Sequence, residues 1–578
     1  MDIYLKLIFY KLRDFIVLHK IYSTVFILYI LSVLIISPWG NYAIGDDLYY
    51  LFQIKSFQNG DFTKNSYIDT SIILQIFIGY GWSFLFGANF LSLRILTILF
   101  TLIFIFVLVK ILKFLKFSNN LIIVTSLLLI FNPKIMFASL SFNSEIYFLT
   151  FLFSSFYFLL KFNEATKLKY LLYFSIIAGF SVWIRQLGFL MLFPALFVFY
   201  LNYKNLSKIS LPKILGIFGI FITLSIVGIL WPKHENPIHQ TSLSLLSVIN
   251  YNNISDKFFV LWKEIPYVSL ILSPFVFFLL KNTNKISKIL ITILSLILAI
   301  FVYQENIFSI GNVLYLEGLY ARGYPILREH LINNLVIKLI LAFSFSLVFI
   351  LALNYTFRNI SNFKSNKTVL LILFTCFVYL SSIFLAGVLY DRYFIYFELF
   401  FLIFFVSILN ILKINLDRTT LFITSWYVIF SIFYSIDFHQ DLKIKWKFAN
   451  EISSERSVKL DEIFIQETFL KYAYIEKIKD YSGMYKIKPD YPEYKCYVSN
   501  DIVQNKNIFG TLFFLSSKAI NKMNLLENKG IFEYGYNAGQ LKQCKDCKIL
   551  KEQGYFSPLY EVLGISKFVK AYCLDEKK

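Results

Sequence analysis

Charged residues are scarce in this chain. Asp, Glu, Lys and Arg make up 16% of its 578 residues, whereas soluble domains average about 25%. Hydrophobic residues make up 57% of the chain, and apolar runs long enough to cross a bilayer, about 20 residues each, recur along most of it. A soluble globular protein is therefore excluded. The fold class that we predict is mainly α, a polytopic bundle of transmembrane helices.

The motifs of several enzyme classes are also missing. The sequence has no glycine-rich loop of the NTPase type, no His–Cys cluster with metal spacing and no Ser, His and Asp in a catalytic order. His234 and His239 share one loop, and two such histidines are more typical of loop residues than of metal ligands. We therefore expect no metal site and no cofactor, although a divalent metal stays open.

Cysteine is rare and unevenly placed. Of the five cysteines, Cys376 lies in an apolar run, whereas Cys496, Cys544, Cys547 and Cys573 lie in the polar C-terminal part. Because no paired histidines accompany them, we favour one or two disulfides over a zinc site. No cleavable signal peptide, internal repeat or low-complexity linker is evident.

The formal net charge of +20 is spread over small lysine clusters between the apolar runs. This pattern indicates membrane topology and not nucleic-acid binding, because lysine and arginine are enriched in cytoplasmic loops. The basic start of the chain places the N-terminus in the cytoplasm, and the composition suggests a bacterial inner (plasma) membrane.

The apolar runs and the lysine clusters predict about 13 spans by span length and loop charge. The run 71–86 is interrupted by Gly79 and Gly81, and we interpret it as an interfacial helix because the later basic loops then all face inward. The expected spans are 22–36, 91–109, 121–136, 146–160, 170–182, 187–201, 214–230, 266–280, 289–302, 335–353, 369–388, 394–412 and 421–436.

The composition changes after Ile436. Residues 437–578 are rich in polar residues and tyrosine and contain no run that could span. We expect two domains, a transmembrane domain at 1–436 and an extracytoplasmic soluble α+β domain at 437–578. Short alternating runs such as 508–514 suggest strands.

Two adjacent carboxylates, Asp46 and Asp47, follow the first span. Ionised groups next to hydrocarbon are costly, which makes such a pair a functional candidate. The alternative is that the pair caps a helix beginning at Leu48, since Asp is a favoured N-cap residue. Both interpretations stay open on the local sequence.

The predicted topology places most lone charges on the outer side of the membrane. Each could snorkel to the interface, and in a long polar loop this is as good an interpretation as function. For arginines wedged between consecutive spans we favour a shared cavity. Carboxylates there can act as general bases, and arginines can hold a phosphate, so a lipid-phosphate donor is suggested. These charges are Asp46, Asp47, Glu145, Arg185, Glu317, Arg322, Arg328 and Arg392.

Several short motifs together resemble the GT-C superfamily of polyprenyl-phosphate-dependent glycosyltransferases, in the branch of the protein O-mannosyltransferases and the lipid A aminoarabinose transferase. They cover the membrane part, about residues 20–413. In chain order they are Gly45-Asp46-Asp47-Leu48-Tyr49-Tyr50, Leu85-Phe86-Gly87 followed by Ser92-Leu93-Arg94, Ala178-Gly179-Phe180 leading to Arg185-Gln186, and Asp391-Arg392-Tyr393. One departure is that 68–71 replaces the Pro pair that many members carry before the interfacial helix.

The resemblance implies an inverting glycosyltransferase that moves a sugar from a polyprenyl phosphate to a lipid, glycan or protein hydroxyl in the cell envelope, with membrane lipid but no nucleic acid as a partner. Asp46 would be the catalytic base, and Asp47 would orient the loop or bind the acceptor. A transporter or flippase of a charged lipid is the alternative, which would show broken helices in paired repeats. The expected substrate-binding residues are Tyr49, Tyr50, Glu145, Arg185, Arg322, Arg328, Arg392 and Tyr393.

Overall fold

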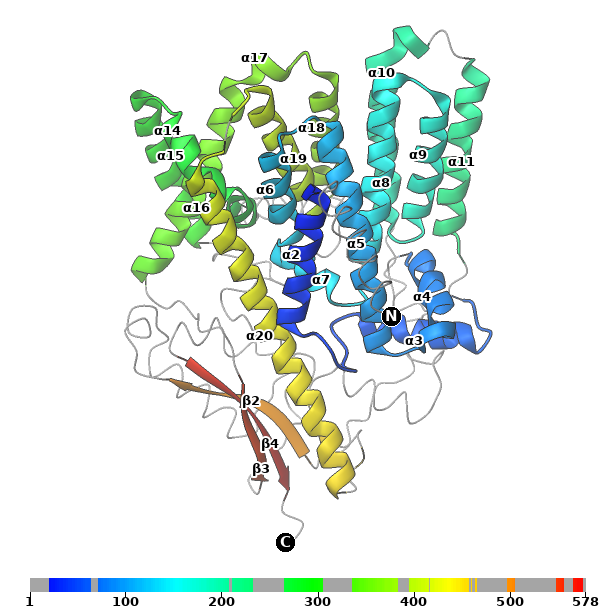
Figure 1. Ribbon diagram of the computed structural model, residues 1–578, viewed down its shortest axis with the longest axis vertical. Helices are drawn as coiled ribbons and strands as arrows, with labels where there is room; N and C mark the ends of the chain where they lie inside the picture. Colours follow the sequence, from blue (N-terminus) through cyan, green and yellow to red (C-terminus); the bar gives the residue numbers. More distant parts are fainter. Residues whose placement is uncertain are drawn as a thin grey trace, which may run out of the picture.

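A computed structural model describes residues 20–63, 71–206, 210–231, 265–304, 335–382, 394–414 and 416–456, residue 459, and four strands between residues 463 and 574. The described chain is mainly helical. Its long helices run side by side in one bundle, and the short helices α3 (Asp47–Gln58) and α4 (Ile73–Phe86) lie together at one end of it (Figure 1).

The first half of the bundle is formed by helices on both sides of a short 3-10 segment. Their bounds are α2 Lys20–Ile36, α5 Phe90–Phe114, α6 Asn119–Ile130, α7 Pro133–Ser139, α8 Ser144–Ala165, α9 Leu168–Val182, η1 Gln186–Met191, α10 Leu192–Leu206 and α11 Leu211–Ile229.

The second half of the bundle ends in a helix of 39 residues. Its bounds are η3 Ser273–Phe275, α14 Val276–Lys281, α15 Lys285–Gln304, α16 Leu335–Arg358, α17 Ile360–Phe363, α18 Lys367–Ser382, α19 Ile395–Ile411 and α20 Arg418–Arg456.

Among the described residues, seven helices are long and apolar enough to cross a membrane, or eight if α6 and α7, bent by 68°, form one span. The remaining expected spans coincide with apolar helices of 10–17 residues. The protein is therefore an integral membrane protein by helix length and composition, and the expected count of 13 spans stays a prediction.

The helix in the ambiguous run, α4 (Ile73–Phe86), has 14 residues, fewer than the roughly 20 that a span requires. It lies beside α3 (Asp47–Gln58) at the end of the bundle (Figure 1). The helix stops at Gly87, whose φ of +77° is a left-handed value that glycine adopts without strain. Phe84 and Leu85 near that end are exposed, as an interfacial helix requires.

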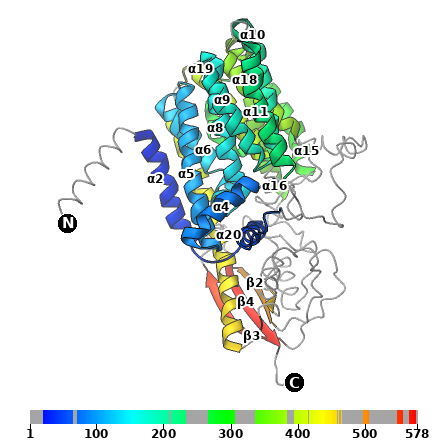
Figure 2. The same ribbon diagram turned by 90° about the vertical axis from the view of Figure 1, so that its right-hand side faces the viewer.

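Helix α20 continues past residue 436, where we placed the domain boundary. Its far half runs beyond α3 and α4, beside a four-stranded sheet (Figure 1 and Figure 2). The strands are β1 Ile463–Phe464, β2 Cys496–Gln504, β3 Cys547–Tyr555 and β4 Ile565–Leu574, in the order β1-β2-β4-β3. Strand β1 is parallel to β2, and the other pairs are antiparallel. The division into two domains stays a prediction.

The antiparallel register places Cys496 of β2 opposite Cys573 of β4. Cys544 lies outside the described residues, as do residues 508–514. The expected disulfides therefore stay a prediction.

A topology reporter tests the orientation of the bundle. The short helix α17, flanked by Arg358 and Lys364, lies at the opposite end from α3 and α4 (Figure 1). If the basic end is cytoplasmic, a reporter fused after Lys578 reads as extracytoplasmic. A fusion within the basic 358–367 segment is the control and reads as cytoplasmic. A cytoplasmic reading at the C-terminus would reverse the sidedness of every candidate site residue.

Candidate active site

The loop between α2 and α3 is held by one buried arginine. Arg94, in the second turn of α5, donates from Nη1 to the carbonyl oxygens of Pro38 (2.6 Å) and Gly40 (3.0 Å), and from Nη2 to that of Tyr42 (2.8 Å). Its guanidinium also lies over the Tyr42 ring, 4.3 Å from the ring centre. Because a planar guanidinium offers several donors in a rigid arrangement, Arg94 fixes the backbone that leads to Asp46 and Asp47.

Helix α20 supports the same loop from the other side. The hydroxyl of Tyr42 and Nδ1 of His439 are 2.8 Å apart, both in buried side chains. Burial raises the pKa of Tyr42 to about 12, so a neutral phenol shares this hydrogen bond with the imidazole nitrogen. The rings of Phe137 and Phe438 meet edge to face nearby. The loop is thus packed between α5, α7 and α20.

The two adjacent carboxylates have different surroundings. Asp46 occupies the N-cap position of α3, but its side chain makes no capping hydrogen bond, and it is half-buried. Asp47 is 1% exposed, and its Oδ2 accepts from the backbone N–H of Ile44 at 3.3 Å. The geometry does not support the cap interpretation for Asp46. Asp47 instead holds the last turn of the loop in place.

The pKa of Asp47 is raised to about 7. Burial is the main cause, and the negative charge of Asp46 adds to it. The positive charge of Arg94 and the backbone N–H groups of Ile44 and Phe142 oppose the shift. Asp47 therefore takes up a proton on folding at any pH between its ordinary pKa of 3.8 and its folded pKa of about 7.

Replacement of Asp47 by Asn tests this shift. A carboxyl whose folded pKa exceeds its unfolded pKa of 3.8 stabilises the fold fully at low pH, and this contribution is lost as the pH rises through about 7. We expect Asp47→Asn to match wild type in thermal unfolding at pH 4 and to be more stable at pH 8. Asp61→Asn, just after the end of α3, is the control. A stability difference that does not change with pH would contradict the shift.

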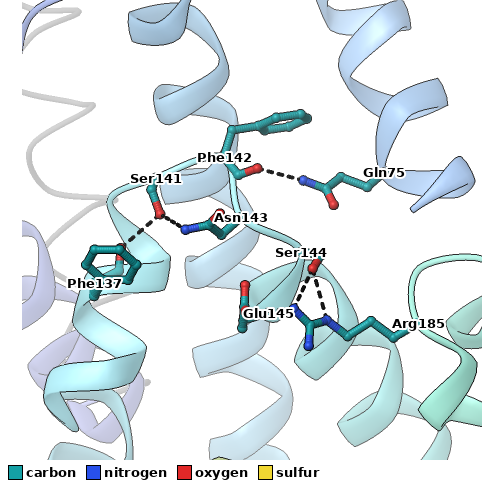
Figure 3. Close-up of polar contacts among 8 residues, drawn as sticks. All are labelled: Gln75, Phe137, Ser141, Phe142, Asn143, Ser144, Glu145 and Arg185. Carbon is teal, nitrogen blue, oxygen red and sulfur yellow. Dashed lines mark hydrogen bonds and ion pairs between the residues drawn. The ribbon is translucent and has the colours of Figure 1, made fainter. Parts of the chain in front are cut away.

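The turn between α7 and α8 makes a second set of polar contacts in the site (Figure 3). Arg185, in the turn between α9 and η1, pairs with Glu145 at 2.6 Å, and both side chains are buried. The Arg185 Nε and Nη2 groups also donate to Ser144 Oγ at 2.9 and 2.7 Å. Two residues before Ser144, the carbonyl oxygen of Phe142 accepts from Nε2 of Gln75 of α4 at 2.8 Å.

Phe142 connects this turn to Asp47 and Tyr50 of α3. Its backbone N–H lowers the pKa of Asp47. Its ring packs edge to face against the Tyr50 ring, with the ring centroids 6.2 Å apart. Two residues further on, the turn reaches Ser144, which accepts the two donors of Arg185. The structure therefore connects most of the expected site residues that it describes through the segment 142–145.

The remaining expected site residues divide into two groups. Tyr49 is half-buried on α3, next to the buried Tyr50. The other expected site residues lie outside the described residues, and they are Arg322, Arg328, Arg392 and Tyr393. The loop residues Glu317, His234 and His239 lie outside them as well.

The sequence analysis did not identify a second buried ion pair. Lys134 of α7 pairs with Glu398 of α19 at 2.5 Å, and their side chains are 1% and 0% exposed. Asn132 donates to the other oxygen of Glu398 at 3.0 Å, and the Lys134 ammonium lies over the Tyr267 ring. The sequence feature that could have identified this pair is that Lys134 and Glu398 are each a lone charge within an apolar stretch.

The described residues hold no group of three His, Cys, Asp or Glu side chains that could ligate a metal ion. The site thus consists of carboxylates at the end of a membrane bundle, with buried arginines beside them. Carboxylates so placed can take a proton from a hydroxyl group.

Comparison with known proteins adds one match. The model of the dolichyl-phosphate-mannose-protein mannosyltransferase family matches residues 74–231, from α4 to the end of α11. This range contains Arg94, Glu145 and Arg185, and it begins after Asp46 and Asp47. No curated protein and no solved structure matches the chain. The family match, on a bundle of membrane helices, supports the resemblance of the membrane part to the GT-C superfamily of glycosyltransferases.

Proposed function

We propose that this protein transfers a sugar from a polyprenyl-phosphate donor to a hydroxyl group of a lipid, glycan or protein on the outer face of the membrane. The observation that carries the proposal is the loop held by Arg94, which presents half-buried Asp46 next to buried Asp47 at one end of the bundle. The mannosyltransferase family match supports the donor class.

Asp46 acts as the general base in this proposal. It takes the proton of the acceptor hydroxyl as the oxygen attacks the anomeric carbon. The bond between that carbon and the phosphate oxygen breaks, and its electron pair leaves with the polyprenyl phosphate. The transition state resembles an oxocarbenium ion, as in other glycosyl transfers, and the configuration inverts.

Asp47 and Arg185 have supporting roles. Asp47 accepts from the Ile44 N–H and so orients the loop that carries the base. The charge of Arg185 is already balanced by Glu145 at 2.6 Å, so Arg185 positions the 144–145 turn. Stabilisation of the leaving phosphate falls to Arg322, Arg328 and Arg392, and Tyr393 follows Arg392 directly in the sequence.

The setting that we propose is a bacterial inner membrane crossed by 13 spans. The N-terminus faces the cytoplasm, and residues 437–578 form an extracytoplasmic α+β domain. The lysine-rich segments between helices support this orientation, and the four-stranded sheet beside α20 supports the folded domain.

A flippase is the second candidate, because one feature of the bundle would also suit it. Helices α6 and α7 are bent by 68° at a short break, and α7 carries Lys134 of the buried ion pair with Glu398. Broken helices with charged groups are typical of transporters. The two functions differ in outcome, because only a transferase separates the sugar from the lipid phosphate.

Mass spectrometry of envelope glycans and lipids from a deletion strain tests the proposal. We expect one envelope component to lose a sugar, and the wild-type gene but not the Asp46→Asn gene to restore it. Unchanged envelope components would contradict the proposal. Full restoration by the Asp46→Asn gene would remove Asp46 from the mechanism.

A further inference from the structure

Three side-chain oxygens at the candidate active site are buried and have no hydrogen-bond donor among the residues that the structure describes. They are Oδ1 of Asp47, Oε1 of Gln75 and Oδ1 of Asn143. The three side chains are 1%, 0% and 2% exposed. Buried polar groups in native proteins are almost always paired, so these acceptors point to a ligand that donates hydrogen bonds.

The other polar atom of each side chain is already held by the protein. Gln75 Nε2 donates to the Phe142 carbonyl at 2.8 Å. Asn143 Nδ2 donates to Ser141 Oγ at 2.7 Å, and the Ser141 hydroxyl donates onward to the Phe137 carbonyl. A carbonyl oxygen accepts only from the amide nitrogen of glutamine, so the orientation of Gln75 is determined. The free atoms of both amides are therefore acceptor oxygens.

The three side chains come from three elements that meet at one segment. Gln75 approaches Phe142 from α4, and Asn143 follows Phe142 in the chain (Figure 3). Asp47, at the start of α3, lies next to the same segment, because the Phe142 backbone N–H lowers its pKa. The acceptors are thus fixed in place beside the Asp46 loop before any substrate binds.

The chemistry of the acceptors selects among the parts of a polyprenyl-phosphate sugar. Phosphate oxygens are themselves acceptors, so acceptor oxygens disfavour the phosphate. The hydroxyl groups of a sugar are donors, and a site built to bind a hydroxyl group strongly rejects an analogue that lacks it. We propose that Gln75 and Asn143, together with Asp47 in its ionised form, make a subsite that accepts hydrogen bonds from the sugar hydroxyls of the donor. This inference rests on the proposed function.

Donor binding to the purified full-length protein tests the subsite. The probes are isoprenyl-phosphate mannose, glucose and galactose, compared with isoprenyl phosphate that carries no sugar. We expect at least one sugar to tighten binding. Gln75→Leu and Asn143→Leu should each lose about tenfold or more of this gain, while their affinity for bare isoprenyl phosphate stays the same.

Matched variants separate recognition of the sugar from general damage to the fold. Asn143→Asp keeps an acceptor oxygen and should keep most of the gain. Asn163→Leu removes a buried amide from the opposite end of the same helix, α8, where it accepts from Asn202 at 2.7 Å. That variant should keep the full gain.

Monodeoxy sugars give the sharpest readout. Wild type should bind one deoxy analogue much more weakly than the parent sugar, and the Leu variant that lacks the matching acceptor should no longer discriminate against that analogue. If Gln75→Leu and Asn143→Leu keep the full gain, or if no sugar tightens wild-type binding, the subsite is overturned. If the gain disappears in EDTA and returns with Mg²⁺ or Ca²⁺, the oxygens hold a cation and the proposal is also overturned.

A failure of the subsite and a failure of the proposed function give different results. A protein that separates the sugar from its lipid phosphate, but whose variants bind the sugar as wild type does, retains the proposed function and loses the subsite. A protein that binds the sugar through these residues without separating it from the lipid phosphate loses the proposed function instead.

Discussion

Asp46→Asn is expected to reduce sugar transfer by about 10²–10⁴-fold, the usual effect of removing a general base. The change keeps the size of the side chain but removes its ability to accept the proton. Asp46 makes no capping hydrogen bond, so the variant should fold and insert like wild type. The measurement is the transfer rate of the purified variant with a polyprenyl-phosphate sugar.

Two further carboxylates serve as comparisons for this variant. Asp47→Asn should cost less, because Asp47 holds the loop at Ile44 and does not take the proton. Asp61→Asn should leave transfer close to wild type, since its carboxylate bonds to Ser56 and Thr63 in the same stretch of chain. Near-native activity of Asp46→Asn would show that Asp46 is not the base.

The largest expected effect on stability comes from Lys134→Met. It leaves Glu398 buried without its cation, which typically costs about 3–5 kcal/mol. The double variant Lys134→Met/Glu398→Met should recover most of the loss, because replacing a buried ion pair by apolar groups of similar volume is often neutral. Thermal unfolding in detergent measures both.

The control for this experiment is an exposed ion pair. Lys447 and Glu451 on α20 lie 3.7 Å apart, with side chains 57% and 33% exposed. Lys447→Met should therefore change stability by less than about 1 kcal/mol. If Lys134→Met destabilises the protein no more than Lys447→Met does, the Lys134–Glu398 pair is not a constraint on the position of α7 against α19.

Local sequence predicted much of the helical architecture, because apolar runs determine where membrane helices form. Helices occupy the described parts of all the expected spans. The ambiguous run ends at Gly87 and forms only the 14-residue α4. Helix α20 was harder to predict, because polarity rises after Ile436 while the helix continues to Arg456. A composition boundary marks a change of surroundings and need not end a helix.

The contacts within the site could not be predicted from the sequence in the same way. Glu145 and Arg185 were both expected near an outer cavity, but their direct pairing across 40 positions of sequence depends on how α8 and α9 pack. Arg94 was noticed only as part of a motif, and its three carbonyl partners lie more than 50 residues away. Long-range polar contacts of this kind depend on the tertiary fold and leave no periodic pattern in the chain.

The measurement that tests the central claim most directly is release of isoprenyl phosphate from an isoprenyl-phosphate sugar by the purified protein. It is made with an envelope extract as the source of acceptor. Wild type is predicted to release isoprenyl phosphate in equal amount to the sugar transferred, and Asp46→Asn is predicted to release almost none. Movement of the intact donor across a bilayer, with the sugar still attached and no isoprenyl phosphate released, would contradict the account and identify a flippase.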